Sequence, residues 1–321
     1  MASSITAHAS FVTDATASAR RESVYRPARP LNLLQTVGTR PRGPGDPTMV
    51  VDGGTIWIAM RTPVGLATLA LRQHENEVHA VAWGAGAELA LDSVPRLCGR
   101  DDDDSEFDAS RHPLIAHAAR RHPGLRLGRT DQVFDSLVMS ILEQKVTAVQ
   151  AFSGWRALVR RFGAQAPGPS PRPLFAAPTP DEWHVIASWE WHRAGVEPPQ
   201  SRTIVRIAER GERIAGAVLR AGSGAERDHV LTSLPGVGVW TAAETRARAL
   251  GDADAVSVGD YHLAHQVGYA LTGSRTDDAG MLELLAPWAG QRQRVIRLIM
   301  RSGVVEPRRG PRLAPEDHRR R

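Results

Sequence analysis

The stretch Leu231-Thr-Ser-Leu-Pro-Gly-Val-Gly-Val-Trp-Thr-Ala-Ala243 interrupts a helical pattern and restarts it after a short turn. Pro235 lacks an amide hydrogen, and Gly236 and Gly238 can adopt backbone angles that other residues avoid, so one helix ends before the turn and a second begins at Val239. Because these glycines have no side chains, amides at the start of the second helix can approach a phosphate, assisted by the helix dipole. The stretch predicts a helical hairpin that binds a phosphate without reading base sequence.

Asp260 lies in a second stretch, Ser257-Val-Gly-Asp-Tyr-His-Leu263, which follows the second hairpin helix and opens a helical pattern that continues to Leu271. A Pro-Gly-x-Gly turn joins helices in many proteins, and aspartate is a favoured N-cap, so each feature alone has an ordinary structural explanation. The combination resembles the helix-hairpin-helix DNA glycosylases, a superfamily of base-excision repair. Residues 234–242 and 258–260 are most similar to the DNA-3-methyladenine glycosylase II branch.

The resemblance implies that Asp260 is the catalytic carboxylate. Breaking an N-glycosidic bond builds positive charge on the sugar, which a fixed carboxylate stabilises while it orients the attacking water. The target base must first leave the helical stack. A purine alkylated at N3 or N7 is already cationic and leaves easily, and aromatic rings can select it. We therefore expect hydrolysis of alkylated purines of the 3-methyladenine and 7-methylguanine type in double-stranded DNA.

Trp240 falls at the position where bifunctional relatives carry the lysine that cuts the strand. Tryptophan cannot form a Schiff base, and Lys145 is the sole lysine of the chain, so a glycosylase without lyase activity is expected. Trp240 and Trp288 match the aromatic base pocket of the family, although either could serve only core packing. The family has an aromatic residue at the position of Glu244, so Glu244 is a departure. It indicates a different base preference, a second acid or, as we favour, an exposed partner of Arg248 at i+4.

DNA contacts are expected at Gly236, Val237 and Gly238, with further contacts from three other regions. Gln144 and Lys145 end a predicted amphipathic helix over 131–146 with Asp131 as its N-cap, where the family inserts a side chain into the gap left by the flipped base. The family wedge is commonly aliphatic, so Lys145 is a departure. The third region is an arginine stripe at 202, 206, 210 and 213, with Arg202 and Arg206 as candidate backbone contacts and a solvated face as the alternative.

The only cofactor that the resemblance implies is a monovalent cation, K⁺ or Na⁺, held by backbone carbonyls of Thr232, Leu234 and Val237. The single cysteine, Cys98, excludes internal disulfides, a cysteine-based zinc site and a four-cysteine cluster, and its apolar neighbours predict a buried thiol. The lack of a Gly-Lys-Ser/Thr motif excludes a P-loop. No long apolar run indicates a membrane segment, so a monomeric, nucleoid-associated cytoplasmic protein is expected.

The fold class follows from a change of pattern along the chain. Residues 55–60, 65–71 and 78–83 are β-rich runs, and a helical pattern covers 87–97. The run Asp101-Asp102-Asp103-Asp104 is interpreted as a solvated loop at a domain boundary, beyond which all patterns are helical. We predict an α+β protein, with a mainly helical helix-hairpin-helix glycosylase body and an N-terminal antiparallel sheet domain.

The expected parts are a disordered leader over 1–21, a sheet domain over 22–105, the helical domain over 106–303 and a basic disordered tail over 304–321. Besides the helices named above, helical patterns cover 112–121, 147–162, 180–189, 200–220, 280–288 and 291–300. The run 164–180 is rich in proline and is expected to be a loop.

Two alternatives accompany the main hypothesis. Glu244 and Lys145 allow a glycosylase of the same fold with a different lesion. A helix-hairpin-helix protein that has lost catalysis and recognises DNA structure is the other alternative, against which the presence of Asp260 argues.

Overall fold

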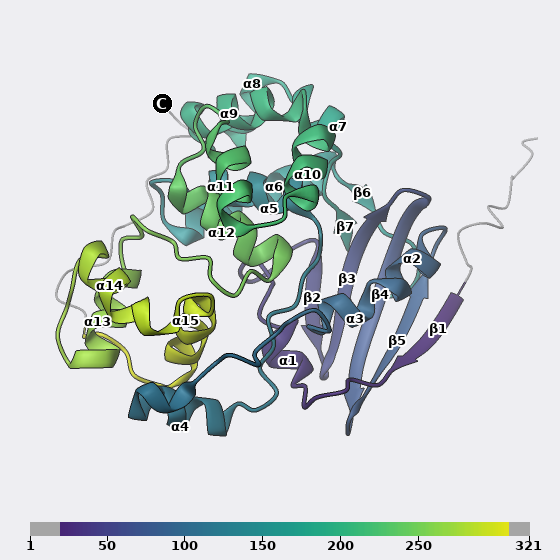
Figure 1. The fold of residues 1–321 in the computed structure, drawn as a ribbon. Coiled ribbons are helices and arrows are strands. Elements are labelled where there is room, and N and C mark those ends of the chain that lie inside the picture. The colour runs from purple at the N-terminus through teal and green to yellow at the C-terminus, as the bar shows by residue number, and fades with distance from the viewer. Residues whose placement is uncertain (1–19, 308–321) are drawn as a thin grey trace, which may run out of the picture.

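A computed structural model describes residues 20–307 of the chain (Figure 1). The predicted leader and tail lie almost wholly outside the described residues. Their inner edges are ordered parts of the fold, because Arg20 and Arg21 begin a strand and Glu306 forms an ion pair with Arg275.

The N-terminal part is a five-stranded antiparallel sheet, as the sequence predicted for its fold class. Its strand order is β1-β5-β4-β3-β2, and the three runs foreseen from the sequence are the adjacent strands β3, β4 and β5. The strand bounds are β1 Arg20–Tyr25, β2 Met49–Asp52, β3 Thr55–Thr62, β4 Gly65–His74 and β5 Glu77–Trp83. The edge strands β1 and β2 were not predicted from the sequence.

Short helices cover one face of this sheet. The helix predicted over 87–97 is divided at Ser93 into α2 (Ala87–Asp92) and α3 (Val94–Leu97), since Pro95 can occupy the first turn of a new helix. Together with α1 (Leu33–Thr36) they bury a core against the inner side chains of β3, β4 and β5. Cys98 is part of this core, and burial raises the pKa of its thiol to about 12. The thiol is buried, as the sequence predicted.

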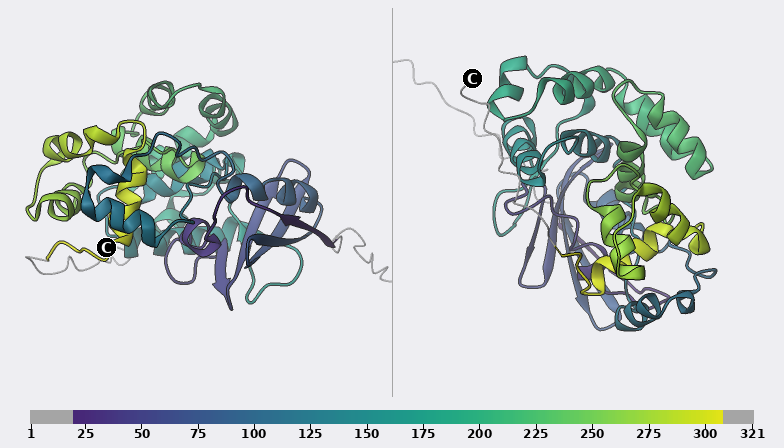
Figure 2. Two further views of the ribbon diagram at one scale, coloured as in Figure 1. Left: turned by 60° about the horizontal axis from the view of Figure 1, so that its bottom comes forward. Right: turned by 90° about the vertical axis from the view of Figure 1, so that its left-hand side faces the viewer.

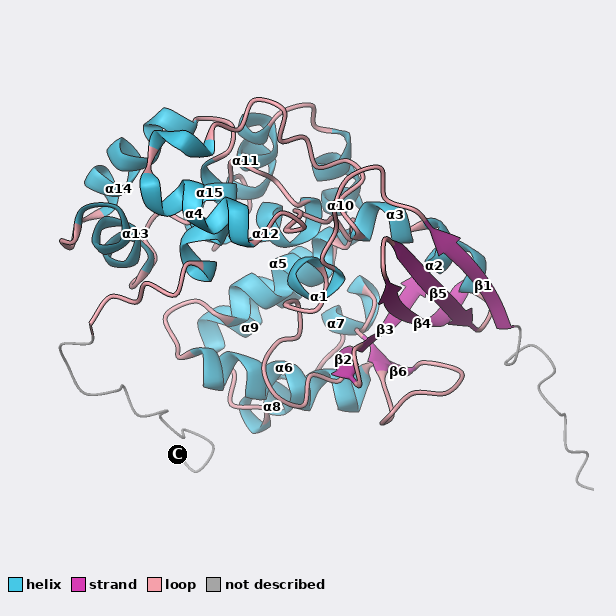
Figure 3. Cartoon of the chain, turned by 90° about the horizontal axis from the view of Figure 1, so that it is seen from below, coloured by secondary structure: helices cyan, strands magenta, loops and turns pink. Residues whose placement is uncertain are grey.

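The rest of the described chain is mainly helical, and Figure 3 shows the helices gathered to one side of the sheet. The helices are α4 Pro113–Arg121, α5 Val133–Leu142, α6 Ala148–Phe162, α7 Pro180–His184, α8 Ser188–Arg193, α9 Pro198–Ala208, α10 Gly211–Arg220, α11 Gly224–Thr232, α12 Val239–Leu250, α13 Leu263–Thr272, α14 Asp278–Leu285 and α15 Arg292–Arg301, with single 3-10 turns η1 Ala109–Arg111 and η2 Ala286–Trp288.

Several predicted boundaries were wrong. The patterns over 180–189 and 200–220 are each two helices, α7 with α8 and α9 with α10. Asp131 is not an N-cap: its φ is 59°, and its carboxylate pairs with Arg96 and Arg129. The run 164–180 is not wholly a loop, because β6 (Ala164–Gln165) and β7 (Phe175–Ala176) pair within it.

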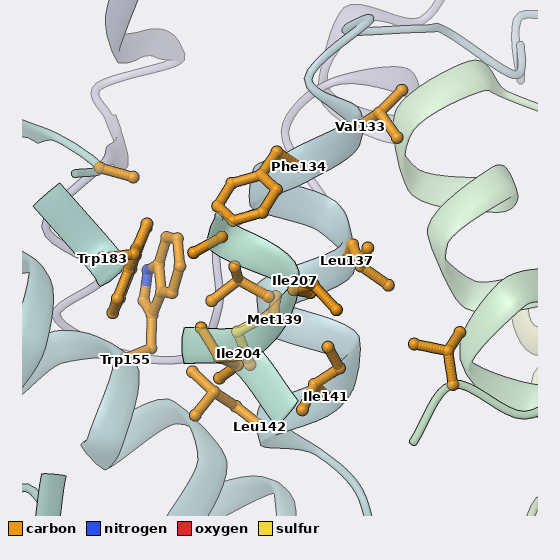
Figure 4. Close-up of a cluster of buried hydrophobic side chains, with 14 of the residues drawn as sticks. Val133, Phe134, Leu137, Met139, Ile141, Leu142, Trp155, Trp183, Ile204 and Ile207 are labelled. Carbon is orange, nitrogen blue, oxygen red and sulfur yellow. The ribbon is translucent and has the colours of Figure 1, made fainter. Parts of the chain in front are cut away.

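The first helical core surrounds α5, which is buried along nearly all of its length (Figure 4). Side chains of α6 to α12 pack around it. Trp183 stacks between Trp155 and Trp191, with ring centroids 6.2 and 5.5 Å away. The hairpin helices belong to this core, where Val237 is 5% exposed.

A second helical core joins segments that are far apart in sequence. Helix α4 packs against α15 (Figure 2). With α13 and α14 these helices enclose a separate cluster of buried side chains. Residues 251–262 connect the two helical cores, and Asp260 lies in this connection. The catalytic candidate is therefore placed at a junction of cores and not within one.

The acidic run 101–104 is not simply a solvated loop, which corrects the sequence interpretation. The side chain of Asp102 is 1% exposed and forms a two-pronged ion pair with Arg294 of α15, while its Oδ2 accepts the N–H of Leu127 at 3.0 Å. Asp104 pairs with Arg126 and Arg29. The run thus fastens the sheet region to the C-terminal helical core.

Among the helices within residues 20–307, none combines the length and apolar character needed to cross a bilayer.

Candidate active site

The hairpin has the backbone that its glycines predicted. Gly236 has a φ of 91°, and a Cβ on this residue would lie 2.5 Å from Thr203 Oγ1, so both its angle and its contact require glycine. Gly238 is the N-cap of α12, and a Cβ there would meet no atom within 4 Å. The start of α12 is therefore open to an approaching phosphate, consistent with the predicted backbone contact.

Gln144 holds the hairpin to the end of α5. Its Nε2 donates to the Gly236 carbonyl at 3.0 Å and to Thr241 Oγ1 at 2.9 Å. Gln144 and Lys145 lie in the turn after Leu142 instead of ending a helix over 131–146, and Lys145 is exposed with a φ of 55°. Gln144 is therefore a positioning residue for the hairpin, while Lys145 is exposed on the turn after α5.

Asp260 is fixed by three donors. Its Oδ1 accepts the backbone N–H groups of His262 and Leu263, both at 2.9 Å, and its Oδ2 accepts the indole N–H of Trp240 at 3.1 Å. The first two bonds satisfy amides before α13, which begins at Leu263 and not at Asp260 as predicted. Oδ2 keeps a lone pair for another donor such as water. The same carboxylate thus caps a helix and presents an oriented oxygen.

The carboxylate of Asp260 faces a cavity of about 500 Å³ that is lined by all three parts of the chain. The sheet region contributes the segment 39–42 and residues 58–61 of β3. The first helical core contributes α5 and α12, and the second contributes α15. This volume lies within the range of small-molecule sites and can hold a single nucleobase.

Glu244 lines this cavity and belongs to a buried charge network. Its Oε2 accepts from Arg248 Nη2 at 2.8 Å and Nε at 3.1 Å, and its Oε1 accepts the hydroxyl of Ser257. Arg248 Nη1 lies 2.7 Å from a carboxylate oxygen of Glu143. The predicted pair with Arg248 is confirmed, but Glu244 is not exposed, since its side chain is 21% accessible within the wall.

Solved structures with the same arrangement of elements are DNA glycosylases. A 3-methyladenine DNA glycosylase from Archaeoglobus fulgidus superposes with a TM-score of 0.73 at 18% identity, covering 87% of this chain and 97% of that one. An 8-oxoguanine glycosylase/lyase from Clostridium acetobutylicum, bound to double-stranded DNA with cytosine opposite 8-oxoguanine, superposes with a TM-score of 0.69 at 13% identity, covering 88% and 96%. The chain has the fold of the helix-hairpin-helix DNA glycosylases. No protein-family model and no curated protein matches its sequence.

Within this glycosylase fold, the two tryptophans expected in the base pocket lie in different surroundings. Trp240 is half-buried beside Asp260 and bonds to it. Trp288 is 6% exposed in the second helical core, where its N–H donates to the Asp108 carbonyl at 2.8 Å. Trp288 packs in that core, and neither it nor Trp240 is among the residues that line the cavity, so the base-pocket role of both stays a prediction.

The arginine stripe is not on one helix of the glycosylase fold, as was expected. Arg202 and Arg206 are exposed on α9, whereas α10 carries Arg213 and begins after Arg210. The stripe is interrupted because the chain turns at 209–210. Arg202 and Arg206 remain predicted contacts for the DNA backbone.

The hairpin carbonyls are compatible with the predicted monovalent cation. The Leu234 carbonyl accepts one hydrogen bond, from the N–H of Val237 at 3.0 Å, and so retains a lone pair. No hydrogen bond to the carbonyl of Val237 is found within residues 20–307, and Thr232 ends α11, where carbonyls lack helical partners. The same range holds no cluster of His, Cys, Asp or Glu suited to a metal ion. The cation site at Thr232, Leu234 and Val237 therefore stays a prediction.

Sequence reasoning missed most of the cavity wall. Arg40, Arg42, Asp135 and Arg297 line it but come from separated segments. One signal was available: Asp135 is a charged residue in the otherwise uncharged helix α5. Burial raises the pKa of Asp135 to about 6, although Arg42 and Arg61 lower it.

Asp135→Asn is expected to stabilise the protein increasingly as the pH rises. The folded state keeps the proton of Asp135 up to a pKa of about 6, whereas the unfolded carboxyl loses it near its ordinary pKa of 3.8, so the carboxylate costs stability as the pH rises through this window. The gain of the variant in unfolding free energy should grow by about 2 kcal/mol between pH 4.5 and pH 8.

Urea unfolding at the two pH values measures this difference. Asp181→Asn, which changes an exposed acid of α7, is the control variant. An Asp135→Asn gain that is equal at both pH values would show that Asp135 does not titrate in this window.

Proposed function

We propose that this protein is a DNA N-glycosylase that releases a damaged base by hydrolysis and leaves the DNA strand uncut. The observation that carries the proposal is the oriented carboxylate of Asp260, which receives the N–H of Trp240 and faces a cavity large enough for one base. A flipped nucleotide in that cavity would place its sugar near Asp260, where a carboxylate stabilises developing positive charge.

The absence of strand cleavage is supported by the residues around Asp260. A lyase reaction needs an amine that attacks the sugar, and Trp240 carries an indole that cannot form a Schiff base. The sole lysine, Lys145, is exposed on the turn after α5 and does not line the cavity. Hydrolysis should therefore end at an abasic site in an intact strand.

The lesion class has two candidates. Alkylated purines of the 3-methyladenine and 7-methylguanine type are supported by the resemblance in residues 234–242 and 258–260. A different lesion on the same fold is favoured by the composition of the wall, in which Phe152 is the single Phe, Trp or Tyr among the described lining residues. The aromatic cage that would select a cationic purine is thus largely missing.

Incubation of the purified protein with duplexes that carry 3-methyladenine, 7-methylguanine, hypoxanthine, uracil or 8-oxoguanine tests the activity. Release of a base, with strand breaks appearing only after alkali treatment, is the expected result. Intact DNA binding without release of any base would support the inactive DNA-binding alternative. A covalent complex trapped by borohydride through Lys145 would contradict the monofunctional mechanism.

A further inference from the structure

The cavity wall contains three arginines that have no carboxylate partner. Arg40 and Arg42 come from the segment that leads to β2, and Arg297 comes from α15. Within residues 20–307, no acidic oxygen lies at ion-pair distance from any of these three guanidinium groups, whereas Arg248 in the same wall pairs with two carboxylates. The three cations are therefore not simply structural ion pairs.

Their hydrogen bonds leave donors available to the cavity. Arg40 donates from Nη1 to the Arg248 carbonyl at 3.0 Å and from Nη2 to the Gly128 carbonyl, but its Nε is buried without an acceptor in the described chain. Arg297 donates from Nη2 to Thr39 Oγ1 at 3.0 Å. A guanidinium has five N–H donors, so Arg40 and Arg297 keep N–H groups that these bonds do not use.

The electrostatic surroundings of the three arginines also favour a hydrogen-bond acceptor in the cavity. Burial, together with the neighbouring charges of Arg297 and Arg42, lowers the pKa of Arg40 to about 10. Burial also lowers the pKa values of Arg42 and Arg297. All three remain charged at neutral pH, so each gains from an acceptor oxygen and loses from another cation.

The loop that carries Arg40 and Arg42 is rigidly held. Asp46 accepts the N–H of Arg42 at 2.6 Å, the N–H of Thr48 at 2.9 Å and the indole N–H of Trp155 at 3.3 Å. The Arg42 guanidinium carbon lies 4.1 Å from the centre of the Trp155 ring. Three further arginines donate to carbonyls of residues 44–49, namely Arg156, Arg160 and Arg172. The N–H donors of Arg40 and Arg42 are thus preorganised.

The carboxylates of the cavity wall differ in whether they already have hydrogen-bond or ion-pair partners. Glu244 and Glu143 flank Arg248, and Asp252 pairs with Arg246 outside the cavity. Asp260 accepts three hydrogen bonds, and Asp135 is the one wall carboxylate for which neither a hydrogen bond nor an ion pair is found within residues 20–307. A cationic base would find most acidic oxygens occupied, while a neutral base with carbonyl oxygens would find unused donors.

We propose that Arg40 and Arg297 select a neutral damaged base whose ring carbonyl oxygens accept their N–H groups, and that they disfavour cationic alkylpurines. This inference rests on the proposed glycosylase activity and names its substrate class. Arg42 extends the donor surface beside Trp155. Asp260 performs the bond cleavage for either class, so the arginines affect which base is bound and not how the bond breaks.

The test compares kcat/KM for a duplex with hypoxanthine, which is neutral and carries a carbonyl, with that for 3-methyladenine, which is cationic and has none. A duplex with 8-oxoguanine and one with 7-methylguanine, which combines charge and carbonyl, complete the series. Because cationic 3-methyladenine leaves more easily on its own, each rate is divided by the rate of spontaneous release, and on this scale the wild type should favour the neutral carbonyl base at least about tenfold.

Arg297→Gln should lower kcat/KM for the carbonyl base by roughly 10- to 100-fold, the effect of losing a charged hydrogen bond, and should leave 3-methyladenine release unchanged or faster. Arg301→Gln removes the same charge one turn further along α15, outside the cavity, and is the matched control. Because the readout is a ratio between substrates, a general loss of folded protein does not change it.

A greater acceleration of 3-methyladenine release over its spontaneous rate, or an equal effect of Arg297→Gln on both bases, would overturn the inference while leaving the glycosylase activity in place. Failure to release any base would instead remove the proposed activity and this inference with it.

Discussion

Asp260→Asn is expected to reduce base release on the order of 10³-fold while leaving DNA affinity nearly unchanged. Asparagine keeps an oxygen that can accept the N–H groups of His262 and Leu263, so the start of α13 should stay capped. It removes the negative charge that we propose stabilises the sugar cation, and losing one preorganised electrostatic contact costs on the order of 10² to 10³ in rate, with a full charge at the upper end.

Single-turnover base release and a DNA-binding titration measure the two effects separately. Asp278→Asn is the matched control, because Asp278 bonds the N–H of Gly259 in the same loop but does not line the cavity. Its amide oxygen can still accept that N–H, so its activity should remain within a few-fold of wild type. Wild-type turnover by the Asp260 variant would remove Asp260 from the reaction.

Asp102→Asn should lower the free energy of unfolding by about 3 to 5 kcal/mol, the usual cost of removing one partner of a buried ion pair. The side chains of Asp102 and Arg294 are 1% and 5% exposed, so the variant would leave a guanidinium uncompensated in the interior. The Leu127 N–H would also keep only a neutral acceptor.

Asp101→Asn provides the comparison within the same acidic run. Asp101 pairs with Arg100 near the surface, where such pairs contribute about 0 to 1 kcal/mol. Chemical denaturation of both variants measures the difference, and the double variant Asp102→Asn with Arg294→Met should recover part of the loss. Equal, small effects of Asp101→Asn and Asp102→Asn would show that the buried pair does not fasten the C-terminal core.

The sequence predicted those features that depend on local chemistry. Proline and glycine at 235–238 define the hairpin because they constrain the backbone directly, and β-rich runs between glycine, proline and polar breaks define the central strands. The pair of Glu244 with Arg248 followed from helical spacing. The antiparallel sheet followed by a helical body was predicted on these grounds.

Features that depend on contacts between distant segments could not be predicted in the same way. Four consecutive aspartates have one local pattern, yet Asp102 is buried because α15 brings Arg294 to it across most of the chain. Trp288 matches a family position, but its surroundings in the second core decide that it packs there. The cavity arginines Arg40 and Arg297 carry no local signal, since they meet only through tertiary packing.

The segment 39–48 shows that the binding cavity does not belong to the helical body alone. The sheet region supplies the guanidinium groups of Arg40 and Arg42, and α6 supplies the tryptophan and arginines that hold their loop in place. Residues 106–303 expressed without the sheet would retain Asp260 and the hairpin but would lack one side of the cavity. Conversely, substitutions in the segment 39–48 would change the groups that meet the base without altering Asp260. Base specificity and bond cleavage could therefore evolve independently in this chain.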